Sequence, residues 1–286
     1  MPEKTNQTIT LEGGRRLGFA EYGSPSGIPV FHFHGSGSSR LDRPAAENLL
    51  TGMGVRFISV DRPGHGLSDF QPDRRIVDWP EDIRQLADHL ELEKFYVQGH
   101  SAGGPHALAC ASLLPERVIA GIVISSVAPM SRPNAYKGMP VFNQILARCS
   151  RSLPFITKLI RKSMRGMVLG DMEKTSRRLM ASIPEADKAV LYASRNLEIF
   201  VASVQEGFRQ GFRAVGQDDI LINREWGFDL RAIKPRIDIW HGEADVNVPL
   251  HAGIYLRNAL PNQRAFFLPG EGHFLLLNRW GEILSK

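Results

Sequence analysis

Ser101 lies in a sequence pattern that is typical of a catalytic nucleophile. Residues 99–103 read Gly-His-Ser-Ala-Gly, which is the G-x-S-x-G pattern, and they lie between the apolar run 95–98 and a helix-like segment. In that context the pattern predicts a sharp strand-to-helix turn that holds the serine above a sheet. Such a turn strains the backbone, and Gly99 and Gly103 leave room for the neighbouring strand and helix. The hydroxyl of Ser101 is therefore the predicted nucleophile.

A serine hydroxyl is a poor nucleophile unless a nearby base accepts its proton. The chain has nine histidines, and His273 is the one in a glycine-rich loop after the last strand-like run, in the stretch Pro-Gly-Glu-Gly-His-Phe at 269–274. A serine at this kind of turn is followed along the chain by an acid and then by a histidine. We therefore expect His273 to be the base.

The acid that orients the histidine is expected between Ser101 and His273. The loop after the strand-like run 237–240 offers two carboxylates, Glu243 and Asp245. The preceding apolar run, 118–125, has no carboxylate at its end. These positions leave both carboxylates open.

Five segments resemble, in order, the motifs of α/β-hydrolase fold enzymes. They are Phe-His-Gly-Ser-Gly at 33–37, Asp-Arg-Pro-Gly-His-Gly-Leu-Ser at 61–68, Gly-His-Ser-Ala-Gly-Gly at 99–104, His-Gly-Glu-Ala-Asp at 241–245 and Gly-Glu-Gly-His at 270–273. The resemblance implies Asp245 as the acid, three residues beyond a glycine and four before a proline. It also implies an oxyanion hole formed by the backbone N–H groups of Ser36 and Ala102. The segment 61–68 resembles a structural turn of the family, without a catalytic role.

These motifs need strands and helices that bring them together. Strand-like runs are expected at 8–11, 17–22, 29–33, 55–60, 95–98, 118–125, 237–240 and 265–268, and helices at 44–53, 79–90, 104–114, 251–260 and after 273. The first two strands read as a hairpin. Strands that alternate with helices imply a mainly parallel sheet covered on both faces. The predicted fold class is α/β, an α/β-hydrolase fold whose core is formed by residues 1–128 and 227–286.

Residues 129–226 interrupt this alternation. Their apolar residues recur at spacings of three and four without a strand-like run, which predicts an inserted helical lid. Residues 131–226 hold 16 Lys and Arg against 9 Asp and Glu, whereas the rest holds 19 against 21. Because these charges are interleaved at helical spacing, a solvated surface is favoured over a nucleic-acid or membrane site. Candidates for an adaptable apolar pocket are Met130, Met139, Phe142, Met164, Met167, Met180, Phe200 and Phe208, although ordinary packing explains the same spacing.

Composition limits the classes of protein that remain. The chain has 286 residues, of which 43% are hydrophobic and 23% charged, as expected for a globular protein. No apolar run approaches the roughly 18 residues of a membrane span, and the first residues do not resemble an export signal. Two cysteines do not form a disulfide framework. We expect a cytoplasmic protein with no cofactor, no metal and no nucleic-acid or membrane partner, and leave its oligomeric state open.

The predicted side chains suit acyl transfer to water. We expect a serine hydrolase that cleaves a carboxylic ester of a small molecule through an acyl-enzyme. Epoxide hydrolases and haloalkane dehalogenases of this fold use an aspartate at the turn, so Ser101 argues against them. The alternatives are a C–C bond hydrolase, a relative of the proline iminopeptidases and a non-catalytic binding protein of the same fold. Proline iminopeptidases share the segment 61–68 but usually have a bulky aromatic residue where this chain has Ala102, and we identify no lid carboxylate for a substrate amine.

Overall fold

The computed structural model describes residues 4–46, 48–132 and 134–285, and all of their side chains except those of residues 164–167, 172 and 182. One sheet holds its strands in the order β1, β2, β4, β3, β5, β6, β7, β8. The strands are β1 (Lys4–Thr10), β2 (Arg16–Gly23), β3 (Ile28–Phe33), β4 (Val55–Val60), β5 (Phe95–His100), β6 (Val118–Ile124), β7 (Arg236–Gly242) and β8 (Gln263–Leu268). β2 is antiparallel to β1 and β4, and the other neighbouring pairs are parallel. The predicted mainly parallel sheet is confirmed.

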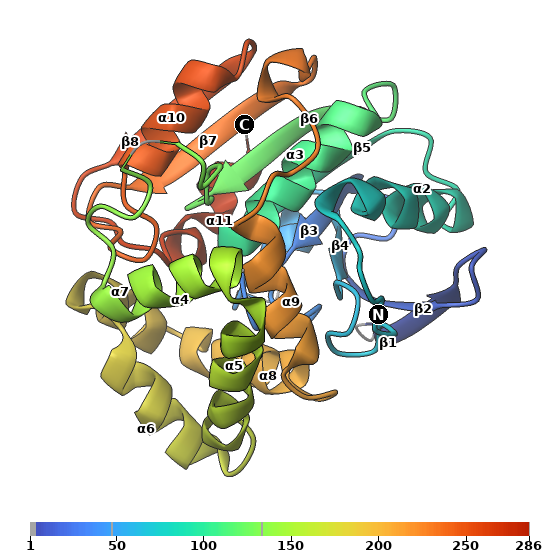
Figure 1. Ribbon diagram of the computed structural model, residues 1–286. Helices are drawn as coiled ribbons and strands as arrows, with labels where there is room; N and C mark the ends of the chain where they lie inside the picture. Colours follow the sequence, from blue (N-terminus) through green and yellow to red (C-terminus); the bar gives the residue numbers. More distant parts are fainter. Residues whose placement is uncertain (1–3, 47, 133, 286) are drawn as a thin grey trace.

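Helices cover both faces of this sheet (Figure 1). In β4, Val55 and Phe57 face one helical layer, whereas Ile58 and Val60 face the other, because side chains alternate along a strand. The layer next to Ile58 contains α2 (Trp79–His89), α3 (Gly104–Leu113) and α10 (His251–Ala259), and the layer next to Phe57 contains α1 (Leu49–Gly52) and α11 (Leu276–Leu284).

The helix expected over 44–53 is wrong at 44–46 and 48, because α1 begins only at Leu49, and residue 47 lies outside the described residues. The chain before it is fixed by side chains from distant segments. The Asp61 carboxylate accepts the Arg40 backbone N–H at 2.7 Å, and the Ser203 hydroxyl accepts the Ser39 N–H at 3.1 Å. These hydrogen bonds hold the irregular loop before residue 44, and α1 begins only after a turn in which the Ala46 carbonyl accepts the Leu49 N–H at 3.1 Å.

Between β6 and β7 the described residues form helices and no strand. These helices are α4 (Val141–Ser152), α5 (Pro154–Val168), α6 (Met172–Ser182), α7 (Glu185–Tyr192), α8 (Asn196–Gly207) and α9 (Arg213–Ile222). Figure 1 shows them gathered together beside one end of the sheet. Residues 129–226 keep the name lid from the sequence-based expectation, and their action as a lid stays a prediction.

Two expectations from composition concern membrane-spanning helices and the cysteines. None of their helices combines the length and the apolar character that crossing a bilayer requires. Cys110 is buried, Cys149 is half-buried, and both are free thiols.

Candidate active site

Ser101 lies directly after β5, on a single 3-10 turn that leads into α3. Its φ of +54° is in the left-handed region, which a residue other than glycine adopts at a cost. A side chain at Gly99 would overlap the carbonyl oxygen of Gly103, and one at Gly103 would overlap the carbonyl oxygen of Phe33. The two glycines therefore allow the strand and helix to meet closely enough to form this turn.

The side chains predicted as nucleophile, base and acid lie in one chain of hydrogen bonds. His273 Nε2 lies 3.0 Å from Ser101 Oγ, and His273 Nδ1 lies 2.8 Å from Asp245 Oδ2. Because an ionised carboxylate only accepts hydrogen bonds, Nδ1 carries the proton and Nε2 is left to accept the serine proton. The three residues come from the loops after β5, β7 and β8, which end at the same edge of the sheet.

The structure separates the two carboxylates that the sequence left open. Asp245 is buried, and its Oδ1 accepts the backbone N–H groups of Asn247 at 2.9 Å and Val248 at 2.8 Å. These contacts fix the carboxylate so that Oδ2 faces the histidine. Glu243 is exposed. Of the two, Asp245 is therefore the one positioned to orient His273.

In the pair His273 and Asp245, burial and the attraction between the two side chains shift each pKa in opposite directions. Burial acts to lower the pKa of His273, but the charge of Asp245 and its hydrogen bond outweigh burial, so the pKa is raised. Burial acts to raise the pKa of Asp245, but His273 outweighs it, so that pKa is lowered. By contrast, burial and the nearby His273 lower the pKa of His100 to about 4. At neutral pH, His100 is therefore uncharged beside the Ser101 turn.

Ser36 and Ala102, the predicted oxyanion-hole residues, border the same cavity as Ser101. The loop that carries Ser36 follows β3 and is tied to the lid helix α9. The Ser36 hydroxyl donates to Asp219 at 3.3 Å, and the Arg62 guanidinium donates to the Gly35 carbonyl at 3.1 Å and to Asp218 at 2.8 Å. Lid and core thus fix the course of this loop together.

The segment 61–68, for which no catalytic role is expected, ties loops together. The Asp61 carboxylate is buried and accepts the N–H of Leu67 at 2.8 Å as well as the guanidinium of Arg40 at 2.9 Å. The Ser68 hydroxyl donates to the Asp61 carbonyl at 2.6 Å and accepts the Gly18 N–H at 2.8 Å. These contacts join the segment to β2 and to the loop after β3.

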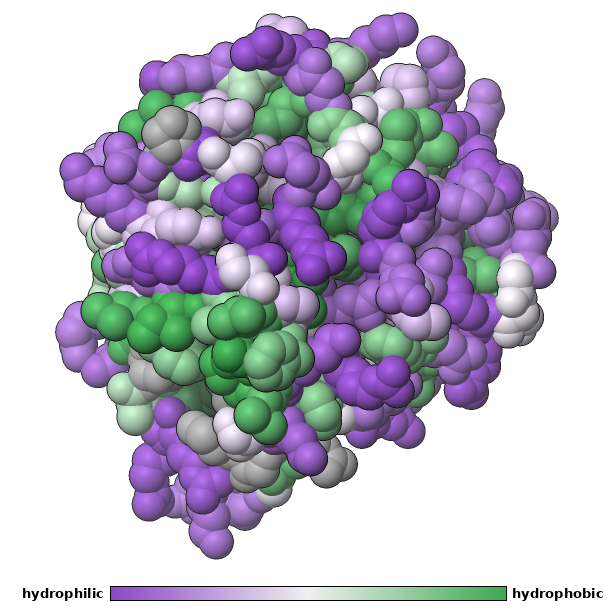
Figure 2. Space-filling view, in the orientation of Figure 1, coloured by the Kyte–Doolittle hydropathy of each residue, from purple (hydrophilic) through white to green (hydrophobic). Residues whose placement is uncertain are grey.

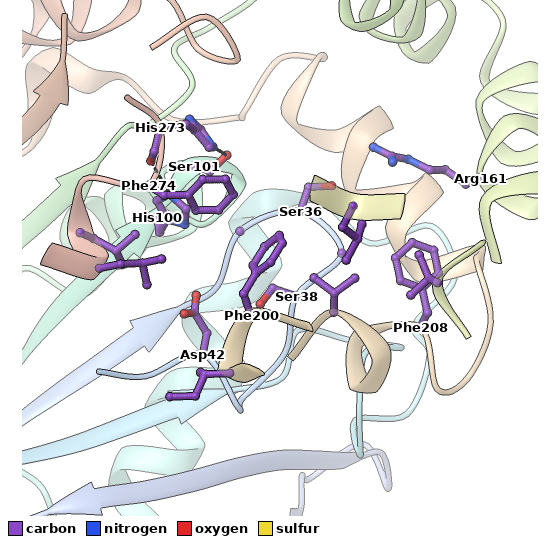
Figure 3. Close-up of a pocket in the computed structure, with 18 residues that line it drawn as sticks. Ser36, Ser38, Asp42, His100, Ser101, Arg161, Phe200, Phe208, His273 and Phe274 are labelled. Carbon is purple, nitrogen blue, oxygen red and sulfur yellow. Dashed lines mark hydrogen bonds between the residues drawn. The ribbon is translucent and has the colours of Figure 1, made fainter. Parts of the chain in front are cut away.

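A cavity of about 230 Å³ opens beside Ser101 and His273 (Figure 3). Core loops form part of its wall, and lid residues Val168, Leu179, Phe200 and Phe208 form another part. A second cavity of about 200 Å³ shares Ser36, Ser101 and Arg161 with the first and is bordered by Met130 and Met139. Ser101 thus lies where two cavities meet.

The lid side chains proposed from the sequence divide into three groups. Phe200 and Phe208 line the first cavity, and Met130 and Met139 line the second. Met180 is buried in a lid cluster, whereas the expectation for Phe142 is wrong, because it is 51% exposed in a hydrophobic area over α4 and α5 (Figure 2). The side chains of Met164 and Met167 lie outside those that the structure describes.

Three polar groups near the site have no signal in the local sequence. Asp187 of α7 is buried, and its Oδ1 accepts the Phe274 N–H at 2.8 Å. Asp42 lines the first cavity, and Arg161 lies between the cavities in a two-bond pair with Asp219. The partner of Arg161 does have a weak signal. Asp219 lies in the run Asp-Asp-Ile-Leu-Ile, and a charged residue next to apolar residues in a helix suggests that its side chain is buried and paired.

The described residues contain no group of three or more His, Cys, Asp or Glu arranged to hold a metal ion. The groups near Ser101 that can take part in chemistry are its hydroxyl, the imidazole of His273 and the carboxylate of Asp245.

Comparisons with known proteins agree with this architecture. A family model described as the alpha/beta hydrolase fold matches residues 28–279. The chain is 36% identical over 115 residues to the dihydrolipoyllysine-residue acetyltransferase component of the acetoin cleaving system of Pseudomonas putida, which is 40% of this chain and 31% of that protein. It is 25% identical over 274 residues to 2-hydroxymuconate semialdehyde hydrolase of Pseudomonas putida, which is 92% of this chain and 86% of that protein. The chain spans less than half the length of the first curated relatives that it matches.

Solved structures show the same fold at low identity. An esterase from Exiguobacterium antarcticum has a TM-score of 0.69 at 20% identity, with 98% of both chains covered. A meta-cleavage product hydrolase from Pseudomonas fluorescens has a TM-score of 0.65 at 20% identity, with 98% of this chain and 96% of that chain covered. Because the family model covers most of the sequence and the sheet and helices have the matching arrangement, this chain belongs to the α/β-hydrolase fold family.

Proposed function

We propose that this protein is a serine hydrolase that cleaves a carboxylic ester of a small molecule through an acyl-enzyme. The observation that carries the proposal is the hydrogen-bond chain from Ser101 through His273 to Asp245, with distances of 3.0 and 2.8 Å. Such a chain activates a serine hydroxyl, because the base lies within reach of the proton and the acid fixes the tautomer of the base.

In the first half of the reaction Ser101 Oγ attacks the ester carbonyl carbon and His273 Nε2 takes its proton. The carbonyl oxygen becomes an oxyanion, which the backbone N–H groups of Ser36 and Ala102 bind. The intermediate then collapses, the bond to the alcohol oxygen breaks, and that oxygen takes the proton from His273. The product of this half-reaction is an ester between Ser101 and the acyl group.

In the second half a water molecule attacks the acyl-enzyme. His273 takes one proton from the water and returns it to Ser101 Oγ as the acid product leaves. Asp245 stays ionised throughout and stabilises the imidazolium, consistent with its lowered pKa. The cycle needs no group beyond these side chains, the two N–H groups and water.

The lid has a part in this proposal. Phe200 and Phe208 from α8 and its end meet the loops of Ser101 and His273 in one cavity, so lid side chains contact any group that fills it. Burying the reacting atoms under the lid excludes water and strengthens the oxyanion contacts. We propose that residues 129–226 decide which acyl groups are accepted.

Similarity supports ester hydrolysis and also favours one competing reaction. Solved neighbours include esterases, among them those of Exiguobacterium antarcticum and Rhodococcus sp.. The alignment with 2-hydroxymuconate semialdehyde hydrolase covers 92% of this chain, so hydrolysis of a C–C bond next to a ketone is the second candidate. Both reactions use a serine, a histidine and an oxyanion site, and the substrate distinguishes them.

Purified wild-type protein and the Ser101→Ala variant test the proposal with p-nitrophenyl butyrate, 2-hydroxymuconate semialdehyde and a fluorophosphonate probe. We expect ester hydrolysis and probe labelling in the wild type and a loss of about 10⁶-fold in kcat in the variant. Ser285→Ala, which changes an exposed serine, serves as the control. If the wild type cleaves 2-hydroxymuconate semialdehyde but not p-nitrophenyl butyrate, the protein is a C–C bond hydrolase rather than an esterase. A folded wild type that neither cleaves these substrates nor is labelled by the probe overturns the proposal and favours the alternative of a non-catalytic binding protein.

A further inference from the structure

The cavity beside Ser101 is lined by apolar side chains and by polar ones, among them the Asp42 carboxylate. Asp42 lies in the loop after β3 and lines this cavity together with Phe200, Leu276 and Leu277. Figure 3 shows Asp42 apart from the group formed by Ser101, His273 and His100. The carboxylate therefore belongs to the cavity but not to the hydrogen-bond chain at Ser101.

Asp42 is held in place through one of its two oxygens. Asp42 Oδ2 lies 3.2 Å from Nε2 of His32, whose side chain is completely buried in β3. The ring of His32 stacks on Phe57 with centroids 5.1 Å apart and meets Trp280 edge-on, so the histidine is fixed in turn. The packing of the sheet thus determines the position of the carboxylate.

The other oxygen of Asp42 has no hydrogen-bond partner among the described residues, and no Lys or Arg of that part of the chain forms an ion pair with this carboxylate. The side chain is only 14% exposed. Asp42 lines the cavity, and a hydrogen bond to a charged group is worth more than one between neutral groups. A ligand that brings a donor to Oδ1 therefore gains more than an apolar ligand of the same length.

We propose that the arm of the substrate that fills this cavity carries a hydrogen-bond donor, a hydroxyl or an ammonium group, which Asp42 Oδ1 accepts. The proposal rests on ester hydrolysis at Ser101 and specifies the substrate class. The apolar side chains accommodate the methylene part of the arm, and the carboxylate recognises its end. Asp42 is then a specificity-determining residue and takes no part in bond cleavage.

Two ester series of matched length test this proposal. One varies the acyl arm as p-nitrophenyl hexanoate, 6-hydroxyhexanoate and 6-aminohexanoate, and the other varies the alcohol arm as butyrate esters of hexanol, hexane-1,6-diol and 6-aminohexanol. We expect the series whose varied arm fills the cavity to show the effect. In that series, esters that end in a hydroxyl or an ammonium group should have a kcat/KM at least about tenfold higher than the ester that ends in a methyl group, which is the ratio that 1.4 kcal/mol produces. A wild type that prefers the methyl end in both series overturns the proposal.

Variants show whether Asp42 causes the preference. Asp42→Leu is expected to abolish the ratio, and Asp42→Asn, which keeps the shape, to retain a preference for hydroxyl and lose that for ammonium. Glu93→Gln removes an exposed carboxylate outside the cavity and should leave the ratio unchanged. A donor preference that persists in Asp42→Leu excludes this role. If Asp42→Leu does not fold, the Asp42→Asn variant provides the test. Loss of its preference for the ammonium end supports the role of Asp42, and an unchanged preference excludes it.

A binding measurement separates this proposal from the proposed reaction. Calorimetric titration of the Ser101→Ala variant with 6-aminohexanol and with hexanol needs no turnover. Tighter binding of the amino alcohol that disappears when Asp42→Leu is added supports the site even if no ester is cleaved. Equal binding of both alcohols overturns the site even if esters are hydrolysed.

Discussion

Asp187 connects the lid to the loop of His273, and replacing it tests whether that connection matters for catalysis. Its Oδ1 accepts the N–H of Phe274, the residue next to His273, at 2.8 Å. A side chain at Gly272, on the other side of His273, would overlap the same carboxylate. Asp187 therefore contacts the backbone on both sides of His273.

The size of the effect follows from these contacts. Asp187→Ala leaves the buried Phe274 N–H without an acceptor, which lowers the free energy of unfolding by about 1–3 kcal/mol. A His273 ring displaced by about 1 Å costs roughly 10²-fold in kcat/KM. Asp187→Asn keeps an oxygen acceptor and is expected to retain stability, but it removes a negative charge that raises the pKa of His273.

The pH dependence of kcat/KM measures the effect of the Asp187 charge on the pKa of His273. The base must be uncharged, so activity falls as pH drops below the pKa of His273 in the free enzyme. Without the negative charge of Asp187 that pKa is lower, and the acidic limb of the profile moves to lower pH in Asp187→Asn. The measurement is ester hydrolysis across pH, with thermal unfolding of each variant recorded beside it.

Asp171→Ala is the matched control, because Asp171 is also a lid aspartate that accepts a backbone N–H, that of Lys174 at 3.0 Å, at the start of α6. Losing this helix cap costs about 1 kcal/mol and should leave the pH profile unchanged. If the Asp187 variants lose only stability, as this control does, and keep the wild-type kcat/KM and acidic limb, Asp187 has no positioning role.

Two further predictions use the same ester assay. Asp245→Asn should lower kcat by about 10⁴, because an amide does not hold the required tautomer of the base, whereas Glu243→Gln should have little effect; collapse in the second variant alone would show that the wrong carboxylate was chosen. Phe200→Ala enlarges the cavity beside Ser101 and should shift the preferred acyl length toward longer chains, whereas Phe142→Ala, outside the cavity, should not. Both phenylalanine variants should still react with a fluorophosphonate, and identical acyl profiles would exclude the role of Phe200.

Local patterns were sufficient to predict the sheet and most of the elements on it. The strand-like runs around 55–60 and 237–240 form β4 and β7, and the turn at Ser101 follows β5 as expected. These predictions succeed because alternation of apolar residues, turn glycines and strand length are properties of neighbouring residues. The helix expected over 44–53 is shorter than predicted, and the loop before it is held by hydrogen bonds from Asp61 and Ser203, which are distant in sequence.

The candidate site also has features that the sequence predicted and features that only the structure revealed. By itself the sequence determined which loops hold the candidate nucleophile and base, because the glycine patterns around Ser101 and His273 are local, and the roles of these residues stay predictions. Only the tertiary structure decided that Asp245 faces His273 and Glu243 does not, that Asp187 of α7 reaches the loop of His273, and that Asp42 shares a cavity with Ser101. Each of these outcomes depends on which side chains from distant segments meet in space and are buried together, and the spacing of residues along the chain does not carry that information.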